Sequence, residues 1–300
     1  MKIFITGGLG FIGRHLSNFL LRQGHQVTAV GTRPVQNLIN DEKFRYISAD
    51  TTRKGAWQDA LQDTDAVINL AGRPIFKRWT KSYKKLIYES RILTTRNLVE
   101  SLPATEQIVL CSASGIGYYG DRGDDILTEN EPVGSDFLAG VSRDWETEAL
   151  HAKEKGIRVV TTRFGVVLGK DGGAMEKMVP AFRFYMGGPM GSGRQWFPWI
   201  HIDDLVLAVK FVLEHKDING PVNFCAPNPV RNRDFAKAMG HVLRRPAIMP
   251  APSFMMRLVM GEFGDLMLFS QRAMPAKLSS CGFTFNHPEV EGAIRDVLEM

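Results

Sequence analysis

The fold is decided by the first fifteen residues, Met1-Lys-Ile-Phe-Ile-Thr-Gly-Gly-Leu-Gly-Phe-Ile-Gly-Arg-His15. Residues 2–6 are a short apolar run with β-branched character, which predicts a strand. Apolar residues then recur at helical spacing, as Phe11, Ile12, Leu16, Phe19 and Leu20. The glycines of a G-x-x-G-x-x-G pattern therefore lie between a strand and a helix, and this context makes the pattern informative.

This stretch predicts a dinucleotide-binding turn. Gly7 permits the tight turn, Gly10 lets the backbone approach a pyrophosphate, and Gly13 lets the helix pack close to the strand. The free N–H groups and the positive dipole end of the helix would then hold the phosphates. A glycine-rich turn without a ligand is the alternative, and we favour the cofactor site. The contacts predicted here are Thr6, Gly7, Gly10, Phe11, Ile12, Gly13 and Arg14.

The composition bounds the class of protein. With 300 residues and 44% hydrophobic content, the chain can build one large α/β domain, or one domain and a small lobe. The net charge of +5 is mild, and because the basic residues form no run we expect no nucleic-acid partner. Cys111, Cys225 and Cys281 stand far apart, which predicts neither a metal site nor a disulfide framework and fits a reducing compartment.

The sequence also predicts where the protein resides. The chain begins at once with a core strand, which leaves no room for a signal peptide. No uncharged apolar stretch reaches about 18 residues, so we expect no membrane span. The prediction is a cytoplasmic monomer or homodimer with a small-molecule substrate and no membrane contact.

Strand and helix patterns alternate along the chain, which predicts an α/β fold with a Rossmann-type doubly wound parallel sheet. Residues 1–172 would form the dinucleotide-binding domain, with the sheet completed by parts of 195–225. Residues 173–245 would supply substrate-side segments, and 246–300 a small, mostly helical C-terminal lobe. The Met-rich stretch after residue 246 also suits a membrane-surface or partner helix, but Glu262, Gly264 and Asp265 interrupt it and favour a packed lobe. The predicted strands are 2–6, 26–30, 44–49, 65–70, 107–112, 157–164 and 221–225, and the later helices are 82–102, 137–155, 205–213, 231–243 and 288–298.

The end of the second strand favours NADP over NAD. An acidic residue there would bind a ribose 2′-hydroxyl, but this chain has Gly31-Thr32-Arg33 and no carboxylate. Arg33 would pair with a 2′-phosphate as a planar donor, and Arg14 would reach the same group. The alternative for Arg33 is a solvated loop charge. Thr32 and Arg33 therefore join the predicted cofactor contacts.

Two further segments are predicted to line the cofactor. Asp50, at the end of the third strand, would contact the adenine amino group or cap the helix that begins near Gly55. Leu70, Ala71 and Gly72 follow the fourth strand, where small residues allow a ribose and diphosphate to pass closely. A plain exit from strand to loop is the alternative for this second segment.

Chemistry is expected at the end of the fifth strand, the usual place in an open parallel sheet. That segment reads Ser112-Ala-Ser-Gly-Ile-Gly-Tyr-Tyr-Gly120. Farther on, a stretch rich in glycine and aromatic residues runs from Gly187 to Asp204, and long loops of this kind usually shape a substrate pocket. Its predicted substrate-side residues are Arg194, Trp196, Trp199 and His201.

The chain resembles the epimerase-dehydratase branch of the extended short-chain dehydrogenase/reductase superfamily. The resemblance rests on Thr6–Gly13, Asn69–Gly72, the serine strand ending in Tyr119-Gly120, Arg163 before Gly165, and Trp199–Asp204. More closely it is similar to the atypical YfcH-like epimerase family proteins, in Trp79, 117–120, Trp145-Glu146, 187–189, 229–232 and 271–273. The resemblance covers nearly the whole chain and implies a cytosolic NADP(H)-binding protein whose substrate is unassigned.

One departure from that family concerns catalysis. Typical members place a Tyr-x-x-x-Lys pair on the helix after the fifth strand, where the lysine lowers the tyrosine pKa. None of the six tyrosines here has a lysine four residues on, and the nearest frame reads Ala139 to Arg143. The predicted catalytic residues are Ser114, with Ser112 as the lesser alternative, and Tyr118, which Tyr119 could replace. His201 and Asp203 would act as acid and base or, as the resemblance implies, support the pocket wall.

Two functions follow from this pattern. The first is an NADP-dependent oxidoreductase or epimerase-like enzyme, favoured by the polar and aromatic stretch 187–204. The second is a catalytically silent NADP(H)-binding sensor or scaffold, favoured by the missing Tyr-x-x-x-Lys pair. Nucleic-acid binding through the basic helix at 81–96 is a weaker third, because that helix lacks the aromatic residues on which bases stack.

Overall fold

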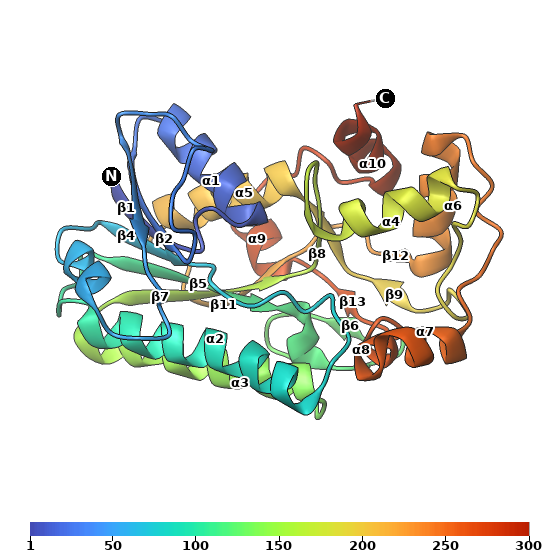
Figure 1. Cartoon of the computed structure of the whole chain (residues 1–300), viewed down its shortest axis with the longest axis horizontal. Helices are drawn as coiled ribbons and strands as arrows, with labels where there is room; N and C mark the ends of the chain where they lie inside the picture. The colour runs from blue at the N-terminus through green and yellow to red at the C-terminus, as the bar shows by residue number, and fades with distance from the viewer. Residues whose placement is uncertain (300) are drawn as a thin grey trace.

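The computed structural model describes residues 1–299, and its centre is a seven-stranded, all-parallel sheet (Figure 1). The sheet contains residues with strong β propensity, many of them fully buried. Its strands are β1 (Lys2–Thr6), β2 (Gln26–Gly31), β3 (Phe44–Ser48), β4 (Ala66–Asn69), β5 (Val109–Gly115), β7 (Arg158–Phe164) and β11 (Gly220–Phe224).

The strand order is β11-β7-β5-β4-β1-β2-β3. The chain therefore builds outward from β1 through β2 to β3, and then returns to the other side of β1 with β4. In such a sheet the order reverses between β1 and β4, and ligands bind in the crevice outside the carboxyl ends of these two strands. The predicted Rossmann-type fold is confirmed, and the glycine turn lies at this crevice.

Helices cover both faces of the sheet (Figure 1). One face packs against α1 (Phe11–Arg22) and α5 (Ile202–Glu214), and the other against α2 (Lys81–Ser101) and α3 (Phe137–Leu150). Short 3₁₀ helices add to the structure, namely η1 (Ala56–Leu61), η2 (Ile116–Tyr119) and η3 (His151–Lys155). The result is a three-layer arrangement, as the periodicity predicts.

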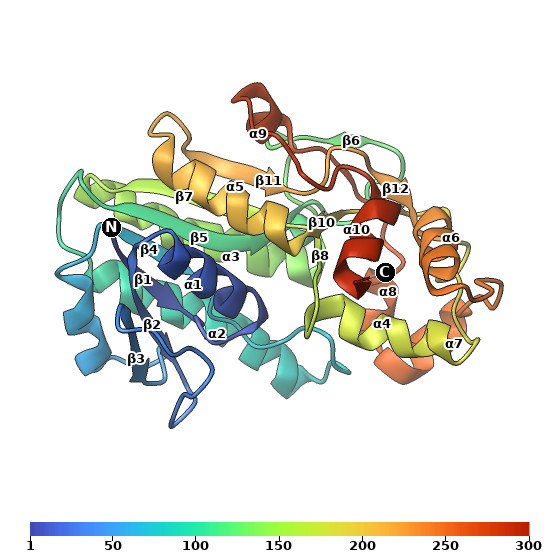
Figure 2. The same ribbon diagram turned by 90° about the horizontal axis from the view of Figure 1, so that it is seen from above.

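The second half of the chain forms a smaller body beside the sheet (Figure 2). Its helices α4 (Gly173–Arg183), α6 (Asn232–Leu243) and α10 (Val290–Leu298) share one apolar core that includes Trp199 and Phe235. Two-stranded pairs join it, made by β8 (Val166–Leu168) with β10 (Trp199–His201), and β9 (Trp196–Phe197) with β12 (Val230–Arg231). Because α10 packs here, residues 290–298 belong to this core.

The remaining C-terminal elements spread over the molecule. Helices α7 (Ser253–Met260) and α8 (Glu262–Leu266) pack on each other, whereas α9 (Ala276–Ser280) lies against β11 of the main sheet. A short strand β13 (Arg272–Ala273) pairs with β6 (Ile126–Leu127). Within residues 1–299, no helix has the length and apolar character needed to cross a membrane.

The observed boundaries differ from the predictions in two places that matter. Strand β5 continues to Gly115, so Ser114 lies on the strand rather than in the loop after it. Helix α4 has no counterpart among the predicted elements, because Pro180 within it and the glycines around it are typical of a loop.

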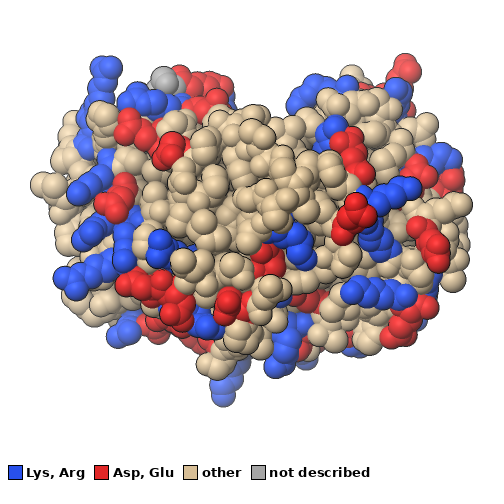
Figure 3. Space-filling view, turned by 180° about the vertical axis from the view of Figure 1, so that it is seen from behind, with Lys and Arg blue, Asp and Glu red and all other residues tan. Residues whose placement is uncertain are grey.

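Charged side chains of both signs are interspersed over the face shown in Figure 3, around a broad uncharged area.

The glycine turn generates a stability prediction. A Cβ on Gly13 would overlap the carbonyl oxygen of Gly7 and lie 2.7 Å from the Cα of Gly8, both parts of the backbone. We expect Gly13→Ala to lower the free energy of unfolding by about 1–3 kcal/mol, the usual range for overpacking. Gly140→Ala is the matched control, because nothing lies near its added Cβ and alanine favours a helix by up to about 1 kcal/mol. Thermal unfolding of both variants checks this, and equal stability would contradict the packing role of Gly13.

Candidate functional site

The turn between β1 and α1 leaves a helix end free at the crevice. Gly7 adopts a positive φ of 69°, and its position would bring a Cβ within 3.1 Å of the Ala71 backbone. Gly10 is the N-cap of α1 and no side chain caps the helix. A Cβ on Gly10 would meet only the Gly7 carbonyl oxygen, at 3.1 Å. The first N–H groups of α1, from Phe11 onward, thus suit an anionic ligand.

Thr6 holds two loops of the crevice together. Its hydroxyl donates to Asn69 Oδ1 at 2.7 Å and accepts from the backbone N–H groups of Leu70 and Ala71, both at 3.1 Å. Because Thr6 is completely buried, it positions the segment after β4 and does not line the crevice itself. This burial argues against the predicted direct cofactor contact at Thr6.

The segment after β4 packs on Arg91, a cation of α2 that the sequence analysis placed only within the basic helix at 81–96. The Arg91 guanidinium lies beneath Gly72, where an added Cβ would come within 3.0 Å of its Cζ. It donates to the carbonyls of Arg73 and Ile87 and lies 5.1 Å from the Trp145 ring centroid. Burial lowers the pKa of Arg91 to about 10, and none of the described carboxylates pairs with it.

The predicted 2′-phosphate residues lie at the other end of the crevice. Thr32 and Arg33 follow β2 and are exposed, and the Arg33 carbonyl accepts a hydrogen bond of 2.9 Å from Tyr46. Arg14 is half-buried, with Nη2 3.5 Å from the carbonyl oxygen of Asp171. The loop therefore holds its backbone in place and leaves the Arg33 side chain in solvent.

Asp50 and Phe11 lie near the crevice and also contact other residues of the chain. Asp50 is exposed and accepts hydrogen bonds from the hydroxyl and N–H of Thr52, the first of which most strongly lowers the Asp50 pKa. It does not cap η1, whose N-cap Gly55 bonds to Gln58 instead. The Phe11 ring packs under the loop 169–173, and Ile12 and Leu70 pack against the core.

A buried ion pair lies at the end of β5. Arg163 of β7 donates two hydrogen bonds of 2.8 Å to the two carboxylate oxygens of Glu146 on α3. Burial opposes the charge on Arg163, but the contacts with Glu146 outweigh it and raise the Arg163 pKa. Ser114 donates to the same carboxylate at 2.7 Å. Ser112 is engaged elsewhere, because its hydroxyl accepts from Asn69 at 3.1 Å.

The two adjacent tyrosines differ in their surroundings. Tyr119 is fully buried, and its hydroxyl donates to Asn223 at 2.7 Å and accepts from Arg163 at 2.9 Å. Burial raises the pKa of Tyr119 to about 12. Tyr118 is half-buried, and its ring lies flat against the Arg163 guanidinium, with Cζ 3.5 Å from the ring centroid. Of the two, only Tyr118 has access to a ligand.

Helix α3 offers no replacement for the missing pair. Ala139 is buried where the tyrosine of typical relatives would stand, and Arg143 points to Asp144 at 2.8 Å. The two positions of the catalytic pair are thus occupied by a methyl group, at Ala139, and by a solvated ion pair, at Arg143. Any acid–base chemistry would have to come from the loop after β5.

A cavity of about 800 Å³ opens between the loop after η2, the glycine-rich segment and α7. Arg194 lines it and is exposed, as predicted for a substrate-side residue. Trp196 lies beside it, held between Arg231 and Arg272 with their Cζ atoms 4.2 and 4.6 Å from a ring centroid. The polar lining includes Asp121, Asp124, Arg194, Arg231, Arg257 and Ser270.

Trp199 and His201 lie in the interior, which corrects their predicted position on the substrate side. Each is only 1% exposed, and Trp199 belongs to the core shared by α4, α6 and α10. On the short strand β10 they stand on either side of the buried Ile200, and an aromatic run of this kind is equally typical of a pocket wall.

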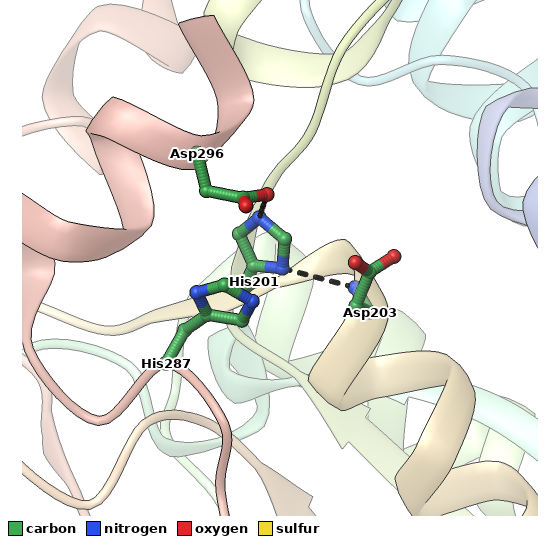
Figure 4. Close-up of side chains that lie close together, drawn as sticks. All are labelled: His201, Asp203, His287 and Asp296. Carbon is green, nitrogen blue, oxygen red and sulfur yellow. Dashed lines mark hydrogen bonds and ion pairs between the residues drawn. The ribbon is translucent and has the colours of Figure 1, made fainter. Parts of the chain in front are cut away.

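His201 forms a cluster with Asp203, His287 and Asp296 (Figure 4). Its Nδ1 accepts the backbone N–H of Asp203 at 3.2 Å, so a neutral ring carries its proton on Nε2. That Nε2 lies 3.2 Å from Asp296, at an angle too oblique for a hydrogen bond. Burial, and then the His287 ring, lower the His201 pKa. A metal ion bound to Nε2 would require the ring proton to be on Nδ1, where it would face the backbone N–H of Asp203. The cluster therefore suits packing and helix capping.

Two comparisons concern families of known sequences. Residues 3–225 match the model of the NAD dependent epimerase/dehydratase family. Residues 251–297 match a domain of unknown function, DUF1731. The first match covers the sheet and the crevice, and the second covers the helices that follow.

Relatives cover the chain from end to end. An epimerase family protein SDR39U1 homolog, chloroplastic, of Arabidopsis thaliana is 39% identical over 100% of this chain and 87% of its own length. The crystal structure of human epimerase family protein SDR39U1 (isoform 2) with NADPH is 31% identical, covers 100% of this chain and 99% of that one, and has a TM-score of 0.87. A UDP-glucuronic acid 4-epimerase of Bacillus cereus shares the fold, with a TM-score of 0.80 at 19% identity. The chain therefore belongs to the NAD dependent epimerase/dehydratase family.

Proposed function

We propose that the chain binds NADP(H) in the crevice and acts as an oxidoreductase or epimerase-like enzyme on a small polar substrate. The observation that carries the proposal is the uncapped start of α1, where a Cβ on Gly10 would meet no atom but the Gly7 carbonyl oxygen. A helix end of this kind favours phosphate groups through its free N–H groups and its dipole. The structure of the human relative holds NADPH, which supports the same cofactor here.

The preference for NADP(H) rests on charge. Position 31 ends β2 with glycine, and the exposed Arg33 follows two residues later. A guanidinium pairs with a phosphate through parallel hydrogen bonds, whereas a ribose hydroxyl needs an acceptor that this loop does not offer. Thr32 and Arg14 border the same space and would complete the 2′-phosphate site.

The cofactor, when bound, would accept or donate a hydride, and the chain would supply the polar groups. Ser114 already donates its proton to Glu146, and the bidentate contact with Arg163 keeps that carboxylate an acceptor. Ser114 therefore offers lone pairs, which suit a substrate hydroxyl better than a carbonyl. Its expected task is to position the substrate by accepting from a hydroxyl next to the reacting carbon, while the proton of the reacting oxygen is exchanged with another group.

Tyr118 would then supply the mobile proton. Its half-buried ring lies against Arg163, and it stands on η2, directly before the loop that lines the cavity. A phenol at such a place acts as acid or base for a carbinol. The cavity with Arg194 and its mixed charges suits a polar substrate, including one that carries a phosphate or carboxylate.

The alternative function is a catalytically silent NADP(H)-binding sensor or scaffold. It is favoured by Ala139, which leaves α3 without a catalytic phenol. Under this alternative Tyr118 packs on Arg163 and does no chemistry. The cavity of about 800 Å³ beside the loop favours the enzyme, because a scaffold has little need for it.

The compartment and assembly are part of the same proposal. All three cysteines are free, two of them buried and Cys281 exposed, which supports a reducing compartment such as the cytoplasm. A monomer or a homodimer fits this proposal equally well.

The crevice is tested by Gly10→Val. The valine Cβ would meet the protein only at the Gly7 carbonyl oxygen, 3.1 Å away, and the side chain would occupy the phosphate position. We therefore expect at most a small loss of thermal stability and at least about tenfold weaker binding of both NADPH and NADH. Gly292→Val is the control, since it adds the same side chain at an exposed site. Cofactor titration with retained affinity for Gly10→Val would rule out this crevice.

The 2′-phosphate site is tested by Arg33→Ala. Loss of a charge-assisted hydrogen bond should weaken NADPH binding by roughly 10- to 100-fold and leave NADH within twofold. Arg45→Ala removes an equal charge near the start of β3, away from the crevice, and should change neither. Fluorescence titration measures all four affinities, and equal losses for the two cofactors would disprove the role of Arg33.

The catalytic proposal is tested by Tyr118→Phe. In an NADPH oxidation assay against carbonyl compounds, we expect roughly 100-fold slower turnover with an unchanged Kd for NADPH. Tyr185→Phe, at an exposed position far from the crevice, should be as active as the native chain. Unchanged turnover in Tyr118→Phe would leave Tyr118 as a packing residue.

A further inference from the structure

Large apolar side chains are concentrated on one end of the molecule. Among the described residues sixteen large hydrophobic side chains are exposed, and nine of these lie in two short segments. Phe184, Ile248 and Leu258 are 72%, 83% and 72% exposed. An exposed patch of this size marks a binding surface more often than chance. The apolar end surface, as we call it, consists of Phe184, Tyr185, Met186, Ile248, Met249, Phe254, Met255, Leu258 and Val259.

Backbone hydrogen bonds hold the two segments side by side. Met249 donates to Gly187 at 3.3 Å, and Ala251 donates to Pro189 at 2.9 Å. Helix α7 begins two residues later, at Ser253. Figures 1 and 2 place α7 and the end of α4 at the extremity of the molecule opposite to the β1–β3 edge of the sheet. The nine side chains therefore form one surface, remote from the cofactor crevice.

Helix α7 presents its apolar side outward. Met256 is its only buried residue, and it packs where Gly264 of α8 comes close to the helix backbone. Phe254, Met255, Leu258 and Val259 recur one and four residues apart, which places them on a common outward stripe. An apolar stripe that faced inward would pack on the protein's own core. Because this stripe faces outward, we infer that the helix buries it against another molecule.

The charge around the surface is mainly positive. Residues 177–193 and 244–261, which contain all nine side chains, include five cations. Lys177 and Arg257 pair with Glu176 and Asp265 at the margins, whereas Arg183, Arg244 and Arg245 form no ion pair among the described residues. Arg183 and Arg244 are exposed, and Arg245 lies over the Tyr185 ring at 4.8 Å. Figure 3 shows Lys and Arg side chains along its left edge, the end that contains this surface. The cations are Lys177, Arg183, Arg244, Arg245 and Arg257.

The positive charge favours one kind of binding partner over another for the apolar end surface. A second copy of the chain, related by a two-fold axis, would bring the unpaired Arg183, Arg244 and Arg245 of one rim against those of the other. An anionic lipid bilayer presents both an acyl layer for Phe and Leu side chains and phosphate groups for Arg. With eight residues, α7 is about 12 Å long and would lie in the interface.

We propose that the apolar end surface docks on an anionic phospholipid bilayer, with α7 in the headgroup region. This replaces the expectation, made from the sequence, that the protein has no membrane contact. That expectation relied on the missing span and on Glu262, Gly264 and Asp265, but the structure places these three on α8, outside the surface.

Flotation of the full chain with phosphatidylglycerol–phosphatidylcholine vesicles tests the proposal. We expect binding that disappears on pure phosphatidylcholine and weakens with rising salt. The double variant Phe254→Ser, Leu258→Ser should bind at least about tenfold more weakly, and so should Arg244→Gln, Arg245→Gln. Val35→Ser, which removes a side chain that is 79% exposed elsewhere, should bind like the native chain.

Two results would overturn the proposal. The first is that the native chain and the Phe254→Ser, Leu258→Ser variant bind the anionic vesicles equally well, or that neither binds them. The second is a homodimer in light scattering that the same variant converts to a monomer, which would assign the surface to a second copy. NADPH titration of each variant confirms its fold, and its outcome does not depend on the lipid result.

Discussion

The structure depends on a contact between backbones that leaves no room for a side chain. The first turn of α1 passes so close to β1 that a Cβ on Gly13 would overlap the Gly7 carbonyl, and a Cβ on Gly7 would lie 3.1 Å from the Ala71 backbone after β4. This approach is what aims an uncapped helix end at the crevice between β1 and β4. Thr6 then fixes the second wall by bonding to Asn69, Leu70 and Ala71.

A second constraint acts at the chemical end of the crevice. Glu146 and Arg163 are buried together, and breaking such a pair is costly because the remaining charge stays in the interior. The pair fixes the direction of the Ser114 proton and lies beneath the Tyr118 ring. The same contact therefore stabilises the fold and determines that Ser114 accepts, and does not donate, toward a ligand.

The sequence predicted the parts of the molecule that local patterns determine. Glycine spacing and strand periodicity are local, so β1 matched its predicted bounds and the parallel sheet was confirmed. Whether an aromatic residue faces a pocket or a core depends on distant packing, so Trp199 and His201 were misplaced. Arg91 carried no signal of its environment, and Glu146 was noted only for its resemblance to the family, because a contact with Gly72 or Arg163 cannot be deduced from local spacing.

The central claim is that the crevice binds NADP(H), and titration of the native chain with NADPH and NADH tests it most directly. The open helix end and Arg33 predict saturable binding of both cofactors, with NADPH at least about tenfold tighter. If neither NADPH nor NADH bound, the assignment of Gly7, Gly10 and Gly13 to a dinucleotide site would be contradicted.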